Sequence, residues 1–120
     1  MNSPHKVLLI DSADDRKQRI KALSERGYTV FPALRMEEAR SRCMRGAYDL
    51  IVVHAGNEQQ RALEFCDEVR QQCPKQLLLL SGDGGSGRDY AVADDMQALL
   101  KRVDALLPNN KTNADMASAA

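Results

Sequence analysis

The segment YDLIVVHAG, residues 48–56, contains four consecutive apolar residues, Leu50 to Val53, followed directly by His54. A short apolar run that does not alternate with polar residues is typical of a strand buried on both faces of a parallel sheet. Two more runs of this kind are VLLI at 7–10 and LLLL at 77–80. Together, these runs predict the central strands of one parallel sheet.

Two weaker strands are also predicted. YTVFP at 28–32 ends on a proline, which edge strands tolerate, and YAV at 90–92 is short. Between the strands, apolar residues recur at helical spacing. The predicted helices span 14–25, 36–45, 58–73 and 96–107. This alternation of strands and helices predicts an α/β protein with a doubly wound, flavodoxin-like sheet of five mostly parallel strands.

Local signals mark the ends of several predicted helices. Gly27 follows the first helix as a C-terminal stop, and Pro74 ends the third. Asp94 or Asp95 is the expected N-cap of the last helix. We therefore expect one domain over residues 1–108, and a polar tail or linker over 109–120.

The composition excludes several classes of function. Seventeen basic and seventeen acidic residues cancel, so no overall field attracts nucleic acid or an anionic membrane. Two Phe, three Tyr and no Trp are too few aromatic residues for a base-stacking platform. The N-terminal MNSPHK lacks the apolar core of a signal peptide, and no apolar run has the length of a membrane span. A cytoplasmic protein is therefore expected.

The cysteines do not predict a metal site. Cys43, Cys66 and Cys73 are odd in number and form no C-x-x-C pair. A zinc site that joins them to His5 or His54 is the weaker hypothesis, and small apolar fillers in a reducing compartment are the stronger one. No metal and no cofactor is expected.

Several segments at consistent spacing resemble the receiver domain of bacterial response regulators. KVLLIDSADDRKQRIKALSERGYTV at 6–30 is similar to the receiver opening, and GAYDLIVV at 46–53 to the run that leads into the phospho-acceptor aspartate. ALEFCDEVR at 62–70 resembles the third-helix segment. LLLLSG at 77–82 and RDYAVADD at 88–95 resemble the fourth and fifth strands with their flanks. The resemblance covers residues 6–107.

The resemblance implies five positions of a phosphorylation pocket. In chain order they are Asp11, Ser12, His54, Ser81 and Ala93. Asp11 keeps the first of two metal-binding acids, and Ser81 keeps the signalling hydroxyl. Ser12 replaces the second acid, His54 replaces the acceptor aspartate, and Ala93 replaces the lysine that contacts the phosphoryl group.

These replacements remove the chemistry that the family reaction needs. Phosphoryl transfer to an aspartate requires a carboxylate nucleophile, Mg²⁺ held by oxygen ligands, and a cation that clamps the phosphoryl oxygens. A lysine left without its carboxylates would be an unpaired buried charge, at a cost of roughly 3–5 kcal/mol, so its loss together with them is physically consistent. The resemblance therefore implies a pseudo-receiver with a degenerate pocket and no enzymatic activity.

Alternatives remain open for individual residues. His54 is expected to be a neutral imidazole that hydrogen-bonds Ser12, Ser81 or backbone, rather than a phosphoryl acceptor. Asp14, Asp15 or Asp83 could act as a substitute acceptor, which would make the chain a working phosphorelay receiver.

The segment SGDGGSGR at 81–88 leaves only eight residues between the fourth and fifth strands. Receivers carry their fourth helix in this interval. Eight residues reach roughly 26–29 Å, which permits a parallel crossover without a helix, although an antiparallel hairpin is the alternative. The glycines also allow a small ligand- or nucleotide-binding flavodoxin-like protein, but the phosphate-loop pattern is absent.

A missing fourth helix would leave apolar surface of 77–80 and 90–92 exposed, or covered by another segment. Exposed apolar patches mark interaction sites on soluble proteins. The expected interaction surface consists of Tyr90, Met96, Leu99, Leu100 and Val103. The predicted function is a stand-alone receiver-like adaptor that binds another signalling protein, or a second copy as a homodimer, without phosphorylation. No nucleic acid or membrane partner is expected.

Overall fold

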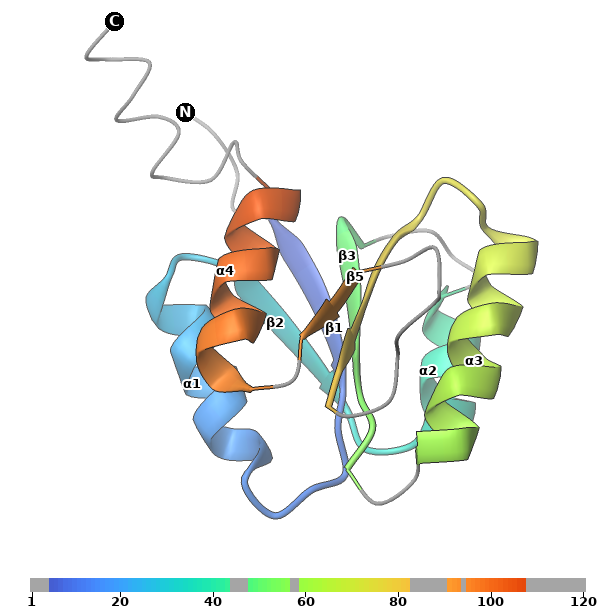
Figure 1. The fold of residues 1–120 in the computed structure, drawn as a ribbon, viewed down its shortest axis with the longest axis horizontal. Helices are drawn as coiled ribbons and strands as arrows, with labels where there is room; N and C mark the ends of the chain where they lie inside the picture. The colour runs from blue at the N-terminus through green and yellow to red at the C-terminus, as the bar shows by residue number, and fades with distance from the viewer. Residues whose placement is uncertain (1–4, 44–47, 57–58, 83–90, 94, 108–120) are drawn as a thin grey trace, which may run out of the picture.

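A computed structural model describes residues 5–43, 48–56, 59–82, 91–93 and 95–107 (Figure 1). The strands are β1 (Lys6–Ile10), β2 (Thr29–Ala33), β3 (Leu50–His54), β4 (Leu77–Ser81) and β5 (Ala91–Ala93). The helices are α1 (Arg16–Glu25), α2 (Met36–Cys43), α3 (Gln59–Gln72) and α4 (Met96–Leu106). The strands form one sheet in the order β2-β1-β3-β4-β5, and every neighbouring pair is parallel.

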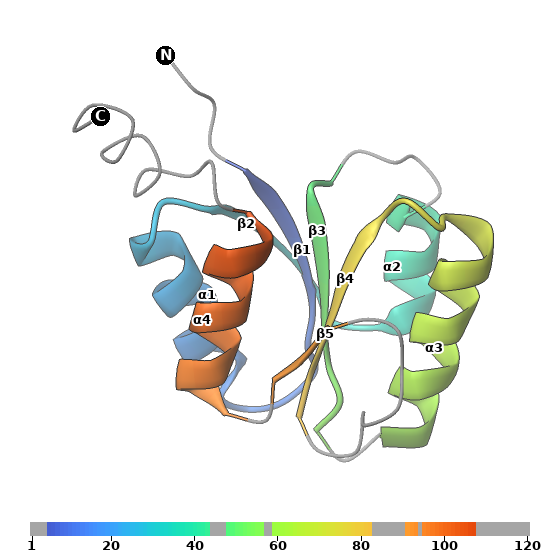
Figure 2. The same cartoon turned by 45° about the horizontal axis from the view of Figure 1, so that its top comes forward.

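The helices cover both faces of the sheet. Figures 1 and 2 show α1 and α4 on one face and α2 and α3 on the other. Because successive side chains of a strand point to opposite faces, each central strand contributes to two clusters of buried side chains. Leu79 packs with Leu23 of α1 and Leu99 of α4, whereas Leu80 packs with Phe65 of α3. The doubly wound α/β sandwich predicted from the sequence is confirmed.

The predicted strands and helix ends agree with the structure to within a few residues. The three apolar runs become β1, β3 and β4, each longer by one residue. Gly27 ends α1 with a φ of +97°, a left-handed conformation that glycine adopts without strain. Asp95 is the N-cap of α4, since its carboxylate accepts the Ala98 N–H at 2.7 Å.

β5 resolves the question of the last crossover. Leu80 pairs with Val92 in a parallel register, which confirms the parallel crossover and excludes the antiparallel hairpin. Tyr90, most of the glycine-rich segment and the predicted tail lie outside the described residues. Among the described helices, none is long and apolar enough to cross a membrane.

The apolar residues of β4 were predicted to be either exposed or covered by another segment, and most of them are covered. Leu77 is 38% exposed, but Leu78, Leu79 and Leu80 are buried. Leu78 and Leu80 lie in the cluster that contains Phe65 of α3. Neighbouring helices therefore cover most of β4, and only its first residue reaches the surface.

The predicted interaction surface needs a correction on α4. Leu99 and Val103 are fully buried and pack with Val7, Leu9 and Leu23. An apolar stripe at helical spacing goes first to the core, because burial of a leucine or valine side chain contributes roughly 1.5–3 kcal/mol. Leu99 and Val103 therefore cannot contact a partner, while Met96 and Leu100 are half-buried at the edge of this cluster.

Candidate functional site

The carboxyl ends of the strands bring the predicted pocket residues to one edge of the sheet. In the sheet register, His54 lies beside Ser81, and Ser81 lies beside Ala93. Asp11 follows Ile10, which pairs with Val53 next to His54. In the order β2-β1-β3-β4-β5, the chain reverses its winding direction between β1 and β3. Ligand sites of open α/β sheets lie in the crevice at such a switch point.

Asp11 is a buried carboxylate fixed by the backbone around it. Its N–H donates to the carbonyl of Ala33 at 2.9 Å, which continues the contact between β1 and β2 by one residue. Its Oδ1 accepts the N–H of Ala13 at 3.0 Å, so the side chain closes a turn toward α1. Only 3% of the residue is exposed. A carboxylate this buried needs a compensating positive charge.

Arg19 of α1 supplies that charge. Its Nε donates to Oδ2 of Asp11 at 2.5 Å, and its Nη2 donates to Oδ1 at 3.2 Å. The two side chains are only 8% and 2% exposed. This is a bidentate arginine–carboxylate pair, the geometry that gives the strongest charge-assisted hydrogen bonds. No role for Arg19 was predicted from the sequence.

The same guanidinium also binds Asp15, which immediately precedes α1. Nη2 and Nη1 donate to its two oxygens at 2.5 and 3.2 Å. These hydrogen bonds hold the pKa of Asp15 below its usual value, against the smaller effect of desolvation. Burial lowers the pKa of Arg19, but its bonds to Asp11 and Asp15 outweigh burial and raise it. Arg19 is therefore a permanent cation between two carboxylates.

His54 ends β3 beside this cluster, and its Nδ1 lies 3.0 Å from Oγ of Ser81. Of the three partners expected for His54, which were Ser12, Ser81 and backbone, the structure shows Ser81. Burial, and to a smaller extent the charge of Arg19, lowers the pKa of His54 against the opposing effect of Asp11 and Asp15. The imidazole is therefore neutral at pH 7, as the sequence analysis expected.

Comparisons with known proteins agree with this architecture. Neither protein-family models nor curated proteins match the sequence. Among solved structures, the chemotaxis protein CheY4 of Vibrio cholerae superposes with a TM-score of 0.70 at 19% identity, over 86% of this chain and 98% of that one. The response regulator TrrA, in complex with the histidine kinase ThkA, gives 0.71 at 23% identity, over 86% and 98%.

An atypical orphan response regulator, described as revealing a phosphorylation-independent regulatory mechanism, gives a TM-score of 0.65 at 23% identity, over 87% of this chain and 96% of that one. The chain has the receiver fold. At such identities the likeness establishes the architecture, and the chemistry has to be argued from the residues of the site.

The residues of this receiver-fold pocket do not fit Mg²⁺. Both oxygens of Asp11 accept hydrogen bonds from Arg19, so a metal ion would have to displace a buried guanidinium. Mg²⁺ requires oxygen ligands in near-octahedral geometry, and the nitrogen donors of His54 are unsuited to it. Within the described ranges, no three His, Cys, Asp or Glu residues are grouped so as to hold a metal.

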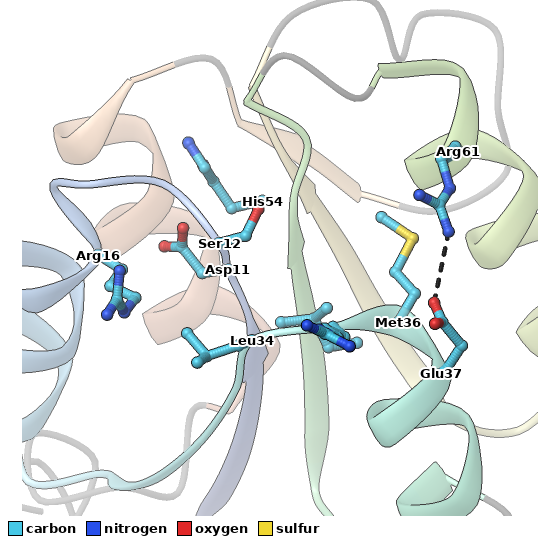
Figure 3. Close-up of a pocket in the computed structure, with 10 residues that line it drawn as sticks. Asp11, Ser12, Arg16, Leu34, Met36, Glu37, His54 and Arg61 are labelled. Carbon is cyan, nitrogen blue, oxygen red and sulfur yellow. Dashed lines mark hydrogen bonds and ion pairs between the residues drawn. The ribbon is translucent and has the colours of Figure 1, made fainter.

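The five predicted pocket residues do not all share one cavity. A pocket of about 480 Å³ opens beside the switch point, and Asp11, Ser12 and His54 lie in its wall (Figure 3). We call it the strand-end pocket. Ser81 does not line the pocket, although a hydrogen bond joins its side chain to that of His54. For Ala93 the structure establishes only its backbone register beside Ser81.

Proposed function

We propose that this chain is a receiver-like signalling adaptor that acts by protein–protein interaction and does not depend on phosphorylation. The observation that carries the proposal is the bidentate pair between Arg19 and Asp11. In a receiver, a metal ion and a phosphoryl group bring new charge into the pocket. Here the buried carboxylate is already neutralised by a side chain of the same molecule.

The acceptor position supports the same proposal. His54 is neutral and hydrogen-bonded to Ser81, the position of the signalling hydroxyl in receivers. The hydrogen bond to His54 holds the Ser81 hydroxyl in one orientation without a phosphoryl group. One solved structure of the same fold is itself described as phosphorylation-independent, which adds support by analogy.

Phosphorylation is tested with acetyl phosphate and Mg²⁺, followed by intact-mass measurement. We expect no phosphoryl adduct on the full chain. An adduct would contradict the proposal and favour a phosphorelay receiver with a substitute acceptor. The variants Asp14→Asn and Asp83→Asn would then locate it. Asp15 is a weak candidate, because Arg19 occupies both of its oxygens and lowers its pKa.

The proposed contact surface is the exposed side of α4 around Met96 and Leu100, together with Tyr90. Leu99 and Val103 anchor the helix in the core, so that the half-buried Met96 and Leu100 are held at its margin. The proposed partner is another signalling protein. The complex of TrrA with a histidine kinase is a precedent for such a partner in this fold.

The surface is tested by substitutions on α4. Leu100→Asp is expected to reduce the recovery of specific partners, measured by quantitative affinity capture of the full chain. Lys101→Asp places a carboxylate on the exposed neighbouring position and is the matched control. Equal recovery by both variants and the unmodified chain would contradict the proposed surface. Light scattering decides between a second signalling protein and a second copy, because self-association would appear as a concentration-dependent dimer.

A further inference from the structure

The strand-end pocket extends beyond the predicted phosphorylation residues. Its volume of about 480 Å³ lies within the range of small-molecule sites, roughly 300–1,000 Å³. Besides Asp11, Ser12 and His54, its wall includes the connection from β2 to α2 and one residue of α3. The predicted ligand site was the glycine-rich segment 81–88, which is a different part of the chain.

Apolar side chains form part of this wall. Leu34 is 49% exposed, and Met36 lies two residues later at the start of α2. In Figure 3 both lie between Arg16 on one side of the pocket and Arg61 on the other. An apolar surface between cationic side chains suits a ligand that has an apolar body and a negative group.

The charges in the wall do not cancel. Arg16, Arg35 and Arg61 face two carboxylates, those of Asp11 and Glu37. Glu37 lies 3.4 Å from Nη2 of Arg61 and forms an ion pair with it.

Asp11 forms an ion pair with Arg19, which does not line the pocket. Arg16 and Arg35 are then the cations of the pocket that have no carboxylate partner among the described residues. The Nη1 of Arg16 donates to the carbonyl of Ala13 at 3.2 Å, which orients this side chain.

We propose that the strand-end pocket binds a small organic anion, an apolar body that carries a carboxylate or a phosphate, without a metal ion. Arg16 and Arg35 bind the negative group, because a guanidinium offers paired donors that match both kinds of anion. Leu34 and Met36 pack against the apolar body. This binding site does not depend on the proposed adaptor function, and it is expected to bind the anion even if α4 binds no partner.

The proposal is tested on the full ¹⁵N-labelled chain in EDTA, with amide resonances followed by NMR. The probes are phenyl phosphate, phenylacetate, inorganic phosphate and benzyl alcohol. We expect phenyl phosphate or phenylacetate to shift the amides of Ser12, Leu34 and Met36. The stronger of the two identifies the preferred anion. Inorganic phosphate and benzyl alcohol, which each lack one half of the proposed ligand, should bind at least about fivefold more weakly.

Three variants separate a specific site from general attraction of anions. Arg35→Ala should weaken binding of the better probe at least about fivefold. Arg102→Ala removes the same charge from an exposed position on α4 and should leave binding unchanged. Glu37→Gln removes the negative charge of the wall and should tighten binding. Equal weakening by Arg35→Ala and Arg102→Ala, a requirement for Mg²⁺, or the absence of shifts at the pocket amides would each overturn the proposal.

Discussion

At the scale of single residues, Arg19 provides a fixed counter-charge for Asp11, which lines the pocket. It binds Asp11 with two hydrogen bonds and Asp15 with two more, and it is itself buried. A divalent cation in a receiver neutralises carboxylates only while it is bound. The Arg19 guanidinium belongs to the chain and is a permanent counter-charge for the buried Asp11, while the cluster of Arg19, Asp11 and Asp15 keeps one net negative charge.

Replacement of Arg19 is expected to destabilise the protein strongly. Arg19→Met would leave the Asp11 carboxylate buried without a cation, and removal of one partner of such a pair costs about 3–5 kcal/mol. Urea denaturation at pH 7 measures the loss. Lys17→Met changes an exposed cation on the same helix and should cost less than about 0.5 kcal/mol. Similar losses for the two variants would show that the buried pair of Arg19 and Asp11 contributes no more to stability than an exposed cation.

His54 should make the free energy of unfolding decrease as the pH falls below about 6.5. Its pKa in the folded protein is lowered, so between this value and about 6.5 the unfolded chain binds more protons. The contribution of neutral His54 is complete above about pH 6.5 and is lost as the pH falls, with a slope of at most about 1.4 kcal/mol per pH unit.

His54→Asn removes this titration and retains a hydrogen-bonding group for Ser81. Urea denaturation between about pH 7.5 and 5.5 should therefore show a smaller loss for the variant than for the unmodified chain. The groups that face His54 are Arg19, which does not titrate here, and Asp11 and Asp15. The pKa of Asp15 is lowered, which places its titration below this window. Parallel curves for the two proteins would contradict the role of His54.

Ser81 was one of three partners predicted for His54, whereas no role was predicted for Arg19. Strand ends in a parallel sheet fall at one edge, so residues that follow two apolar runs are expected to meet. An arginine in a helix is expected at the surface, and its separation of four residues from Asp15 indicates only a local pair. Arg19 reaches Asp11 because α1 packs across the end of β1. This packing is a tertiary feature, and no local sequence pattern predicts it.

At the scale of elements, α4 shows why a correct helix prediction led to a partly wrong surface. The spacing of its apolar residues predicted Met96–Leu107 as a helix, close to the observed bounds. The same stripe was also assigned to a partner. Leu99 and Val103 are fully buried in the core beneath α1 and α4, so only the margin of the stripe is left for contacts.

Asp104 should matter for the docking of α4. Its Oδ1 accepts the hydroxyl of Tyr28 at 2.6 Å, and its Oδ2 pairs with Arg26 at the end of α1. Asp104→Ala leaves the hydroxyl of the buried Tyr28 without this partner, and we expect a loss of about 1–3 kcal/mol in the free energy of unfolding. Lys101→Ala, an exposed change on the same helix, is the control in the same denaturation experiment. A loss for Asp104→Ala no larger than the control would show that the contacts of Asp104 with Tyr28 and Arg26 do not stabilise the docking of α4.

At the scale of the whole molecule, the order of the strands decides which residues can act together. The switch between β1 and β3 places Asp11, Ser12 and His54 at one pocket, while the parallel register carries Ser81 and Ala93 along the same edge. The receiver fold is therefore present, and the residues at its strand ends are Asp11, Ser12, His54, Ser81 and Ala93. A fold alone does not specify chemistry. In this protein, the side chains at the strand ends determine which chemistry is possible.

This separation of fold from chemistry predicts the result of restoring the receiver groups. The substitutions Ser12→Asp, His54→Asp and Ala93→Lys return a second acid, a carboxylate at the acceptor position and a lysine beside Ser81. We expect this triple variant still not to form a phosphoryl adduct with acetyl phosphate and Mg²⁺, because Arg19 continues to occupy both oxygens of Asp11. Addition of Arg19→Leu should free Asp11 for the metal ion and allow the adduct.

Intact mass with and without Mg²⁺ measures both variants, and far-ultraviolet circular dichroism confirms that each retains the fold. A Mg²⁺-dependent adduct on the triple variant with Arg19 in place would show that the guanidinium yields to the metal. In that case the pair between Arg19 and Asp11 would not prevent phosphorylation, and it could not carry the proposed function.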